Sequence, residues 1–245
     1  MPMNTTLKRS RIDRRLFAAA AITFPLIVLA GFARTYYLKT FFHTPPLASM
    51  LVHIHGILMT SWVLLFVSQV WLISSKRIRT HQRLGLSAVA VAVLIIVVGF
   101  FVAVRAAKFG ASTPGPPGIP RLSFLIVPLT DLFNFGVLFG AAIYLRRKAS
   151  DHKRLMLLTA INFFPPAVAR IPVASLQALG PIWFFGFPAA LAVIALSIDW
   201  WQNRKLNKWF LAGTLFLISS FVLRLALMGT STWMLFAGWL TSWAA

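Results

Sequence analysis

The sequence predicts an all-α, polytopic transmembrane helix bundle of about seven spans, in one integral membrane domain that covers residues 1–245. The composition is the first reason: 59% of the residues are hydrophobic and only 11% are charged, whereas a soluble domain carries about 25% charged residues. The second is that the apolar residues form continuous runs of roughly 17–25 residues, the length that crosses a bilayer as a helix. The third is that Lys and Arg gather in alternate connections between these runs.

The predicted spans are continuous apolar runs without the alternation expected of a strand, so each is expected to be a helix. Pro165-Pro166 interrupts the fifth span, where we expect a fixed kink or, alternatively, a hinge. The final segment, 230–245, is too short to span comfortably, and we expect an interfacial helix there, with an eighth span as the alternative. The seven spans are expected at about 16–34, 48–73, 84–105, 122–145, 154–175, 182–200 and 209–228.

The distribution of the 24 Lys and Arg residues predicts the orientation. Most of them lie in the N-terminal segment and in the second-to-third, fourth-to-fifth and sixth-to-seventh connections. The positive-inside rule therefore predicts a cytoplasmic N-terminus and an external C-terminus in a bacterial inner membrane. We interpret the net charge of +20 as attraction to a bilayer with anionic lipids and not as nucleic-acid binding. Protein partners cannot be inferred from this pattern.

Two of the basic connections end in related motifs, each of which opens a new span. One reads His81-Gln82-Arg83-Leu84 and the other His152-Lys153-Arg154-Leu155. This similarity predicts a parallel repeat of two helical hairpins, 48–105 and 122–175. The alternative is that two basic inner connections look alike by chance.

The same motifs carry a family resemblance, together with His53-Ile54-His55-Gly56 in the second span and Asp131 in the fourth. The pattern resembles a set of uncharacterised bacterial seven-helix membrane proteins across about residues 50–170. More distantly, it resembles four-helix cytochrome b561-type cores, in which paired histidines on neighbouring helices hold haem. The resemblance implies haem b as a cofactor.

His81 and His152 each open a helix at the predicted cytoplasmic boundary, so they share a depth. A haem iron held by two histidines needs both at one level, which makes this pair the candidate set of axial ligands. The alternative is an interfacial role, in which these side chains contact lipid phosphate or cap their helices. The absence of cysteine excludes disulfides, iron–sulfur clusters and covalently attached c-type haem.

A second group of polar residues is expected deep in the spans, in the half nearer the outer face. At ~1.5 Å per residue, the members of this predicted outer polar layer lie roughly 21–30 Å from the cytoplasmic ends of their helices. They are His53, His55, Asp131, Arg170 and Arg224. Asp131 is expected to pair with Arg170 or Arg224, since an unpaired carboxylate in lipid is costly. Either this pair only locks helices together, or the layer is a pocket for a ligand.

No metal site is expected, because His53 and His55 diverge by ~200° on a helix and cannot face one ion. No Walker, Rossmann, HExxH or GxSxG motif is present, so the sequence leaves open whether the chain is an enzyme. The leading functional expectation is a membrane protein with b-type haem or a quinone-linked redox role. The alternatives are a carrier or sensor of a small anionic or lipid-like ligand, and a non-catalytic accessory subunit.

Overall fold

The computed structural model describes residues 3–111 and 118–243, with side chains from residue 15 onward, and this part of the chain is helical without strands. The first helix, α1, is continued by a short π-helix, η1, and the remaining elements are α-helices. The bounds are α1 Met3–Phe32, η1 Ala33–Tyr37, α2 Met50–Ser74, α3 Ile78–Phe109, α4 Arg121–Phe124, α5 Ile126–Tyr144, α6 Ala149–Asn162, α7 Phe164–Val168, α8 Ala174–Gln177, α9 Pro181–Asn203, α10 Lys208–Leu227 and α11 Ser231–Ser242.

Within the described residues, six helical segments are long and apolar enough to cross a membrane. They correspond to six of the seven expected spans, at Arg15–Tyr37, Met50–Ser74, Ile78–Phe109, Arg121–Tyr144, Pro181–Asn203 and Lys208–Leu227. The expected fifth span, 154–175, is instead divided between α6 and α7, which have 14 and 5 residues. The membrane class of the protein is therefore supported, but not a seventh continuous span.

Two prolines explain the break between α6 and α7. In a continuous helix the nitrogens of Pro165 and Pro166 would have to donate to the carbonyls of Ile161 and Asn162, and proline has no N–H to donate. The helix ends at Asn162 and resumes at Phe164, with both prolines in the first turn of α7. Such a first turn tolerates proline because its N–H groups lack partners within the helix.

The surface and the core both fit a bundle in lipid. Large apolar side chains such as Leu64, Val93 and Val222 are more than half exposed. Exposed apolar surface costs free energy in water but not among lipid chains. Inside the bundle, the Trp62 ring packs edge-on against the rings of Phe135 and Phe139, at centroid distances of 4.9 and 5.4 Å.

Close backbone approach brings α1 against α7. A Cβ on Gly31 would lie 2.1 Å from the carbonyl oxygen of Ala167, so only glycine permits this crossing. Residues far apart in the sequence are thereby held side by side, with the N-terminal helix covering the break in the fifth segment.

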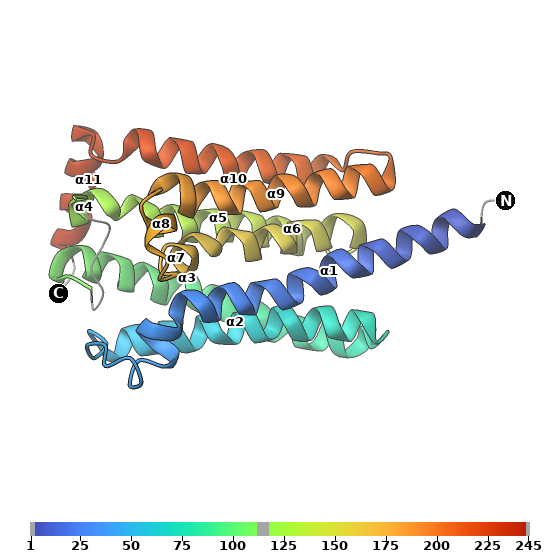
Figure 1. Ribbon diagram of the computed structural model, residues 1–245, viewed down its shortest axis with the longest axis horizontal. Helices are drawn as coiled ribbons and strands as arrows, with labels where there is room; N and C mark the ends of the chain where they lie inside the picture. The colour runs from blue at the N-terminus through green and yellow to red at the C-terminus, as the bar shows by residue number, and fades with distance from the viewer. Residues whose placement is uncertain (1–2, 112–117, 244–245) are drawn as a thin grey trace.

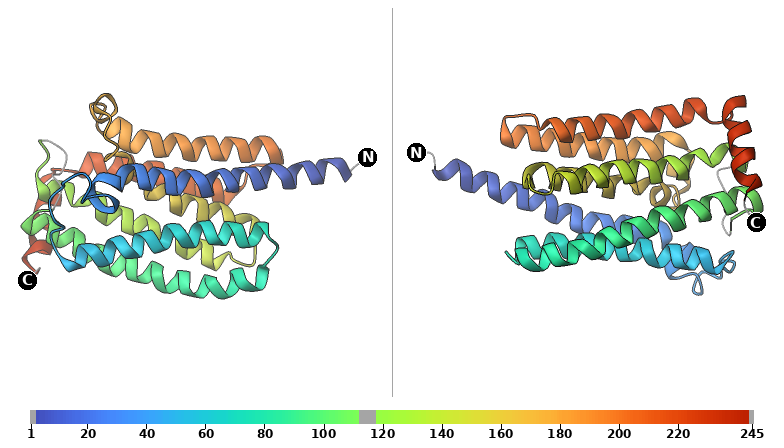
Figure 2. Two further views of the ribbon diagram at one scale, coloured as in Figure 1. Left: turned by 60° about the horizontal axis from the view of Figure 1, so that its bottom comes forward. Right: turned by 180° about the vertical axis from the view of Figure 1, so that it is seen from behind.

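Three connections in which basic residues gather lie at one end of the bundle. Figure 1 shows the α2–α3, α5–α6 and α9–α10 connections at the same end as the N-terminus. We call this the basic end. At the opposite end, α11 runs across the long helices and packs on α3 and α4, as both Figure 1 and Figure 2 show.

Candidate functional site

The two histidines of the repeated motif meet at the basic end of the bundle. His81 lies in the first turn of α3 and His152 in the first turn of α6. Their ring centroids are 6.4 Å apart and their planes are nearly perpendicular, at 80°. The α2–α3 and α5–α6 hairpins therefore present one histidine each to a shared point, which we call the inner histidine pair.

A backbone carbonyl fixes the tautomer of His152. Its Nδ1 lies 2.8 Å from the carbonyl oxygen of Ala142, at the end of α5. A carbonyl oxygen can only accept a hydrogen bond, so Nδ1 carries the proton and the neutral ring keeps its lone pair on Nε2. Histidines that hold metals commonly have this arrangement, in which the second nitrogen is oriented by a carbonyl or carboxylate.

His81 has unmet hydrogen-bonding capacity. Its Nδ1 is buried and has no hydrogen-bond partner among the described residues. Nearby, the Gln69 side chain of α2 donates through Nε2 to the carbonyl oxygen of His81, at 3.3 Å, while its own Oε1 is buried and unpartnered. The ends of α2, α3, α5 and α6 thus converge on a polar spot whose bonding is incomplete.

This geometry can be compared with the needs of a shared metal ion. Two imidazoles on opposite sides of one ion would have ligating nitrogens about 4 Å apart and ring centres about 6 Å apart, since metal–nitrogen bonds are about 2.0–2.1 Å long. The 6.4 Å between the rings of His81 and His152 fits this spacing. The pair therefore offers two ligands that would hold one iron, and two ligands are too few for a closed zinc site.

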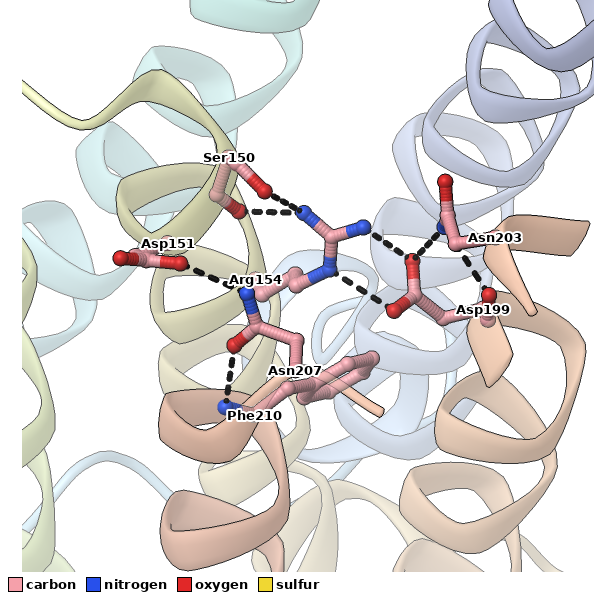
Figure 3. Close-up of polar contacts among 7 residues, drawn as sticks. All are labelled: Ser150, Asp151, Arg154, Asp199, Asn203, Asn207 and Phe210. Carbon is pink, nitrogen blue, oxygen red and sulfur yellow. Dashed lines mark hydrogen bonds and ion pairs between the residues drawn. The ribbon is translucent and has the colours of Figure 1, made fainter. Parts of the chain in front are cut away.

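A buried ion pair lies two residues further along α6 (Figure 3). The guanidinium of Arg154 forms a two-pronged contact with the carboxylate of Asp199 in α9, Nε to Oδ2 at 2.9 Å and Nη2 to Oδ1 at 2.5 Å. Arg154 and Asp199 are only 4% and 2% exposed. The remaining guanidinium nitrogen of Arg154, Nη1, donates to the backbone carbonyl of Ser150 at 2.6 Å. The fixed fork of arginine matches a carboxylate, which makes this a rigid joint between α6 and α9.

Further hydrogen bonds extend this joint to α10. Asn203 donates to the Asp199 carboxylate at 3.0 Å, and Asn207 donates to Asp151 at 2.6 Å (Figure 3). The Asn207 side chain also accepts from the Phe210 amide at 2.9 Å, which caps the start of α10. The first turn of α6, which carries His152, is therefore fixed from several sides.

Sequence reasoning missed the pairing of Arg154 with Asp199. It assigned Arg154 to a basic connection and did not single out Asp199. The signal was available, because Asp199 ends a long apolar run, where a carboxylate needs a cation. The partner was not readable, since Arg154 lies 45 positions away.

Of the predicted outer polar layer, the structure joins Asp131 to Arg224. Arg224 Nη1 lies 2.7 Å from Asp131 Oδ1, and Arg224 is 0% exposed. The guanidinium also stacks over the rings of Phe185 and Phe221, at 5.1 Å from each centroid. The expected ion pair is confirmed, with Arg224 as the partner.

Arg170, the other expected partner, makes different contacts. It donates to the carbonyl of Pro166 at 2.6 Å and stacks over Phe32 of α1 at 5.0 Å. It lies two residues after the end of α7, beyond the helix break, so the regular helix expected for 154–175 does not carry it.

The two histidines of α2 point in different directions, as their spacing predicts. His53 is exposed, and its ring lies 6.5 Å from that of Tyr36. His55 turns toward α3, where its ring faces Gly99, and its Nδ1 is buried without a partner. Among the described residues, no group of three His, Cys, Asp or Glu side chains is placed to hold a metal.

Three polar residues that sequence reasoning did not assign to this layer surround the Asp131–Arg224 pair. Asn162 donates to the backbone carbonyl of Asp131 at 2.9 Å. Asn134 donates to the Ser220 hydroxyl at 2.6 Å, and Arg224 Nε donates to the Ser220 carbonyl at 3.3 Å. We call these five residues, from α5, α6 and α10, the Asp131 network.

Comparison with known proteins does not extend this description: no family model, no curated protein and no solved structure matches the chain. The candidate sites rest on geometry and chemistry alone.

Proposed function

We propose that this protein is a multi-pass membrane redox protein that holds a b-type haem between His81 and His152. The observation that supports this most strongly is the inner histidine pair, with its rings 6.4 Å apart across two hairpins. Nε2 of His152 is available as a ligand because Nδ1 is bound to the Ala142 carbonyl. A haem with two histidine ligands would carry single electrons.

The neighbouring sequence suits such a group. Lys and Arg residues lie a few positions before both histidines, in the segments 76–79 and 146–148. Cations at this level would pair with the carboxylates of a haem. The Arg154–Asp199 joint would hold the first turn of α6, and so the His152 ligand, in a fixed position.

The proposal includes a membrane arrangement. The basic end would face the cytoplasm of a bacterial inner membrane, α6 and α7 together would form the fifth of seven spans, and α11 would lie in the outer interface. The two hairpins that carry the histidines would be a parallel repeat. Support comes from the common end shared by the basic connections in Figure 1.

The test is an absorption spectrum of protein purified from cells supplied with a haem precursor, before and after reduction. A Soret band with sharpened bands on reduction is expected. His81→Ala and His152→Ala should each abolish it, while His53→Ala, at the opposite end, should leave it unchanged. Thermal melting of each variant shows whether the fold is intact.

Two results would overturn the proposal. One is a colourless protein that also fails to bind haemin in a titration. The other is bound haem whose spectrum survives both inner substitutions and depends on His53 or His55.

A further inference from the structure

Three buried polar atoms of the Asp131 network have no hydrogen-bond partner among the described residues. They are Nη2 of Arg224 and the Oδ1 atoms of Asn134 and Asn162. The three side chains are 0–1% exposed. Buried polar groups in proteins are nearly always paired with protein or with ordered water, so three in one place indicate a missing partner.

The hydrogen bonds of the network show that these three groups lie close together. Arg224 and Asn162 both bind Asp131, one through the carboxylate and the other through the backbone carbonyl. Arg224 and Asn134 both bind Ser220, through its carbonyl and its hydroxyl. Two shared neighbours thus place the three side chains around one region between α5, α6 and α10.

The charges and hydrogen-bonding atoms of the Asp131 network indicate which kind of molecule it could bind. The Arg224 charge is already balanced by Asp131, so the site has no excess charge to attract an anion. The unpartnered atoms are a donor, Nη2, and two amide ends. Neither amide can be turned over, because Asn162 faces a carbonyl oxygen that only accepts and the Ser220 hydroxyl already donates to the Leu217 carbonyl. The unpartnered amide atoms are therefore both acceptors, and a small molecule that both donates and accepts, such as water, satisfies them together with Nη2.

Packing closes the Asp131 network toward the basic end of the bundle. Toward the basic end, Leu138, Leu158 and Leu217 are 0–2% exposed and form an apolar layer. A Cβ on Gly213 would lie only 2.6 Å from Leu158, so this layer is tightly packed. On the other side, α6 ends at Asn162, a member of the network. Irregular backbone at such depth is tolerated where it is buried in protein or lines a hydrated cavity.

We propose that the Asp131 network is an internal hydration site, in which ordered water bridges Arg224 Nη2 to the amides of Asn134 and Asn162. The site is closed toward the basic end by the leucine layer and adjoins the α6–α7 break. It is independent of the inner histidine pair, so it does not rest on the presence of haem.

The test is radiolytic hydroxyl labelling of the intact protein in detergent, with oxidation read by mass spectrometry. Bound water is converted to hydroxyl radicals that oxidise adjacent side chains, even buried ones. Phe185 and Phe221 touch Arg224 and are 4% and 3% exposed. Phe66 and Phe210 are buried to a similar degree, at 6% and 0%, but Phe66 packs on Phe24 of α1 and Phe210 lies in the first turn of α10. The first two should be oxidised several-fold faster than the last two.

A paired substitution supplies the second arm. Asn134→Leu combined with Asn162→Leu removes both amides, and the fast labelling of Phe185 and Phe221 should fall to the level of Phe66 and Phe210. Equal labelling of all four phenylalanines in the wild-type protein would overturn the proposal, and this comparison needs no variant to fold. Fast labelling that survives the paired substitution in a folded protein would also overturn it, because the water would then lie elsewhere.

Discussion

Replacing either member of the Asp131–Arg224 pair should expose how much the bundle depends on it. Asp131→Asn keeps the shape of the side chain but leaves the Arg224 charge buried without compensation. Arg224→Gln leaves the carboxylate in the same position and also removes the stacking on Phe185 and Phe221. Removing one partner of a buried pair costs about 3–5 kcal/mol, and each lost stacking contact adds about 0.5–2 kcal/mol.

The magnitude translates into a large shift in melting. At roughly 2–4 °C per kcal/mol for a chain of this size, each single variant should lower the apparent melting temperature by about 10 °C. The double variant, Asp131→Asn with Arg224→Gln, carries no buried charge and two amides that can bond each other. It should therefore recover much of the loss, giving a coupling of about 2 kcal/mol or more. Thermal unfolding in detergent, followed by light scattering and intrinsic fluorescence, measures all four proteins.

Arg170 provides the matched control for this cycle. It is an arginine in the same half of the bundle, but its contacts are the Pro166 carbonyl and the Phe32 ring. The effects of Asp131→Asn and Arg170→Gln should therefore add to within about 0.5 kcal/mol. If Arg170 couples to Asp131 and Arg224 does not, the pairing is wrong and the argument for the hydration site fails with it.

Three further predictions concern other parts of the bundle. Asp199→Asn should destabilise the protein by about 3–5 kcal/mol, because it leaves the buried Arg154 charge without its partner. Asp151→Asn should cost about 1 kcal/mol, since Asp151 is half-buried and bonded to neutral Asn207. Equal melting temperatures of the two variants would refute this distinction. Gly31→Ala should disrupt the α1–α7 crossing, while Gly140→Ala, where nothing lies within 4 Å of the new carbon, should melt like the wild type; a folded and unshifted Gly31→Ala protein would contradict the close approach. Reporter fusions after residues 78, 150 and 206 should read cytoplasmic and a fusion near 178 external, and an external signal at any of the first three would reverse the proposed orientation.

The sequence by itself determined the helices and their rough limits. Six of the seven expected spans correspond to long helices, because an apolar run of that length has one economical structure in lipid, and this constraint acts locally along the chain. The break at Pro165-Pro166 is also a local effect, since each proline lacks a backbone donor. Two similar motifs at the starts of two helices placed His81 and His152 at one level along the bundle, but the 6.4 Å between their rings depends on how the two hairpins pack.

Only the tertiary structure decided which polar side chains meet. Asp131 pairs with Arg224, 93 positions away, and not with Arg170; Arg154 pairs with Asp199 in another helix. Hydropathy gives the depth of a residue but not the rotation of its helix, and that rotation is set by side-chain packing over the whole bundle. The same limit hid Asn134, Asn162 and Ser220, because an amide or hydroxyl in an apolar run becomes part of a network only when neighbouring helices turn its partners toward it.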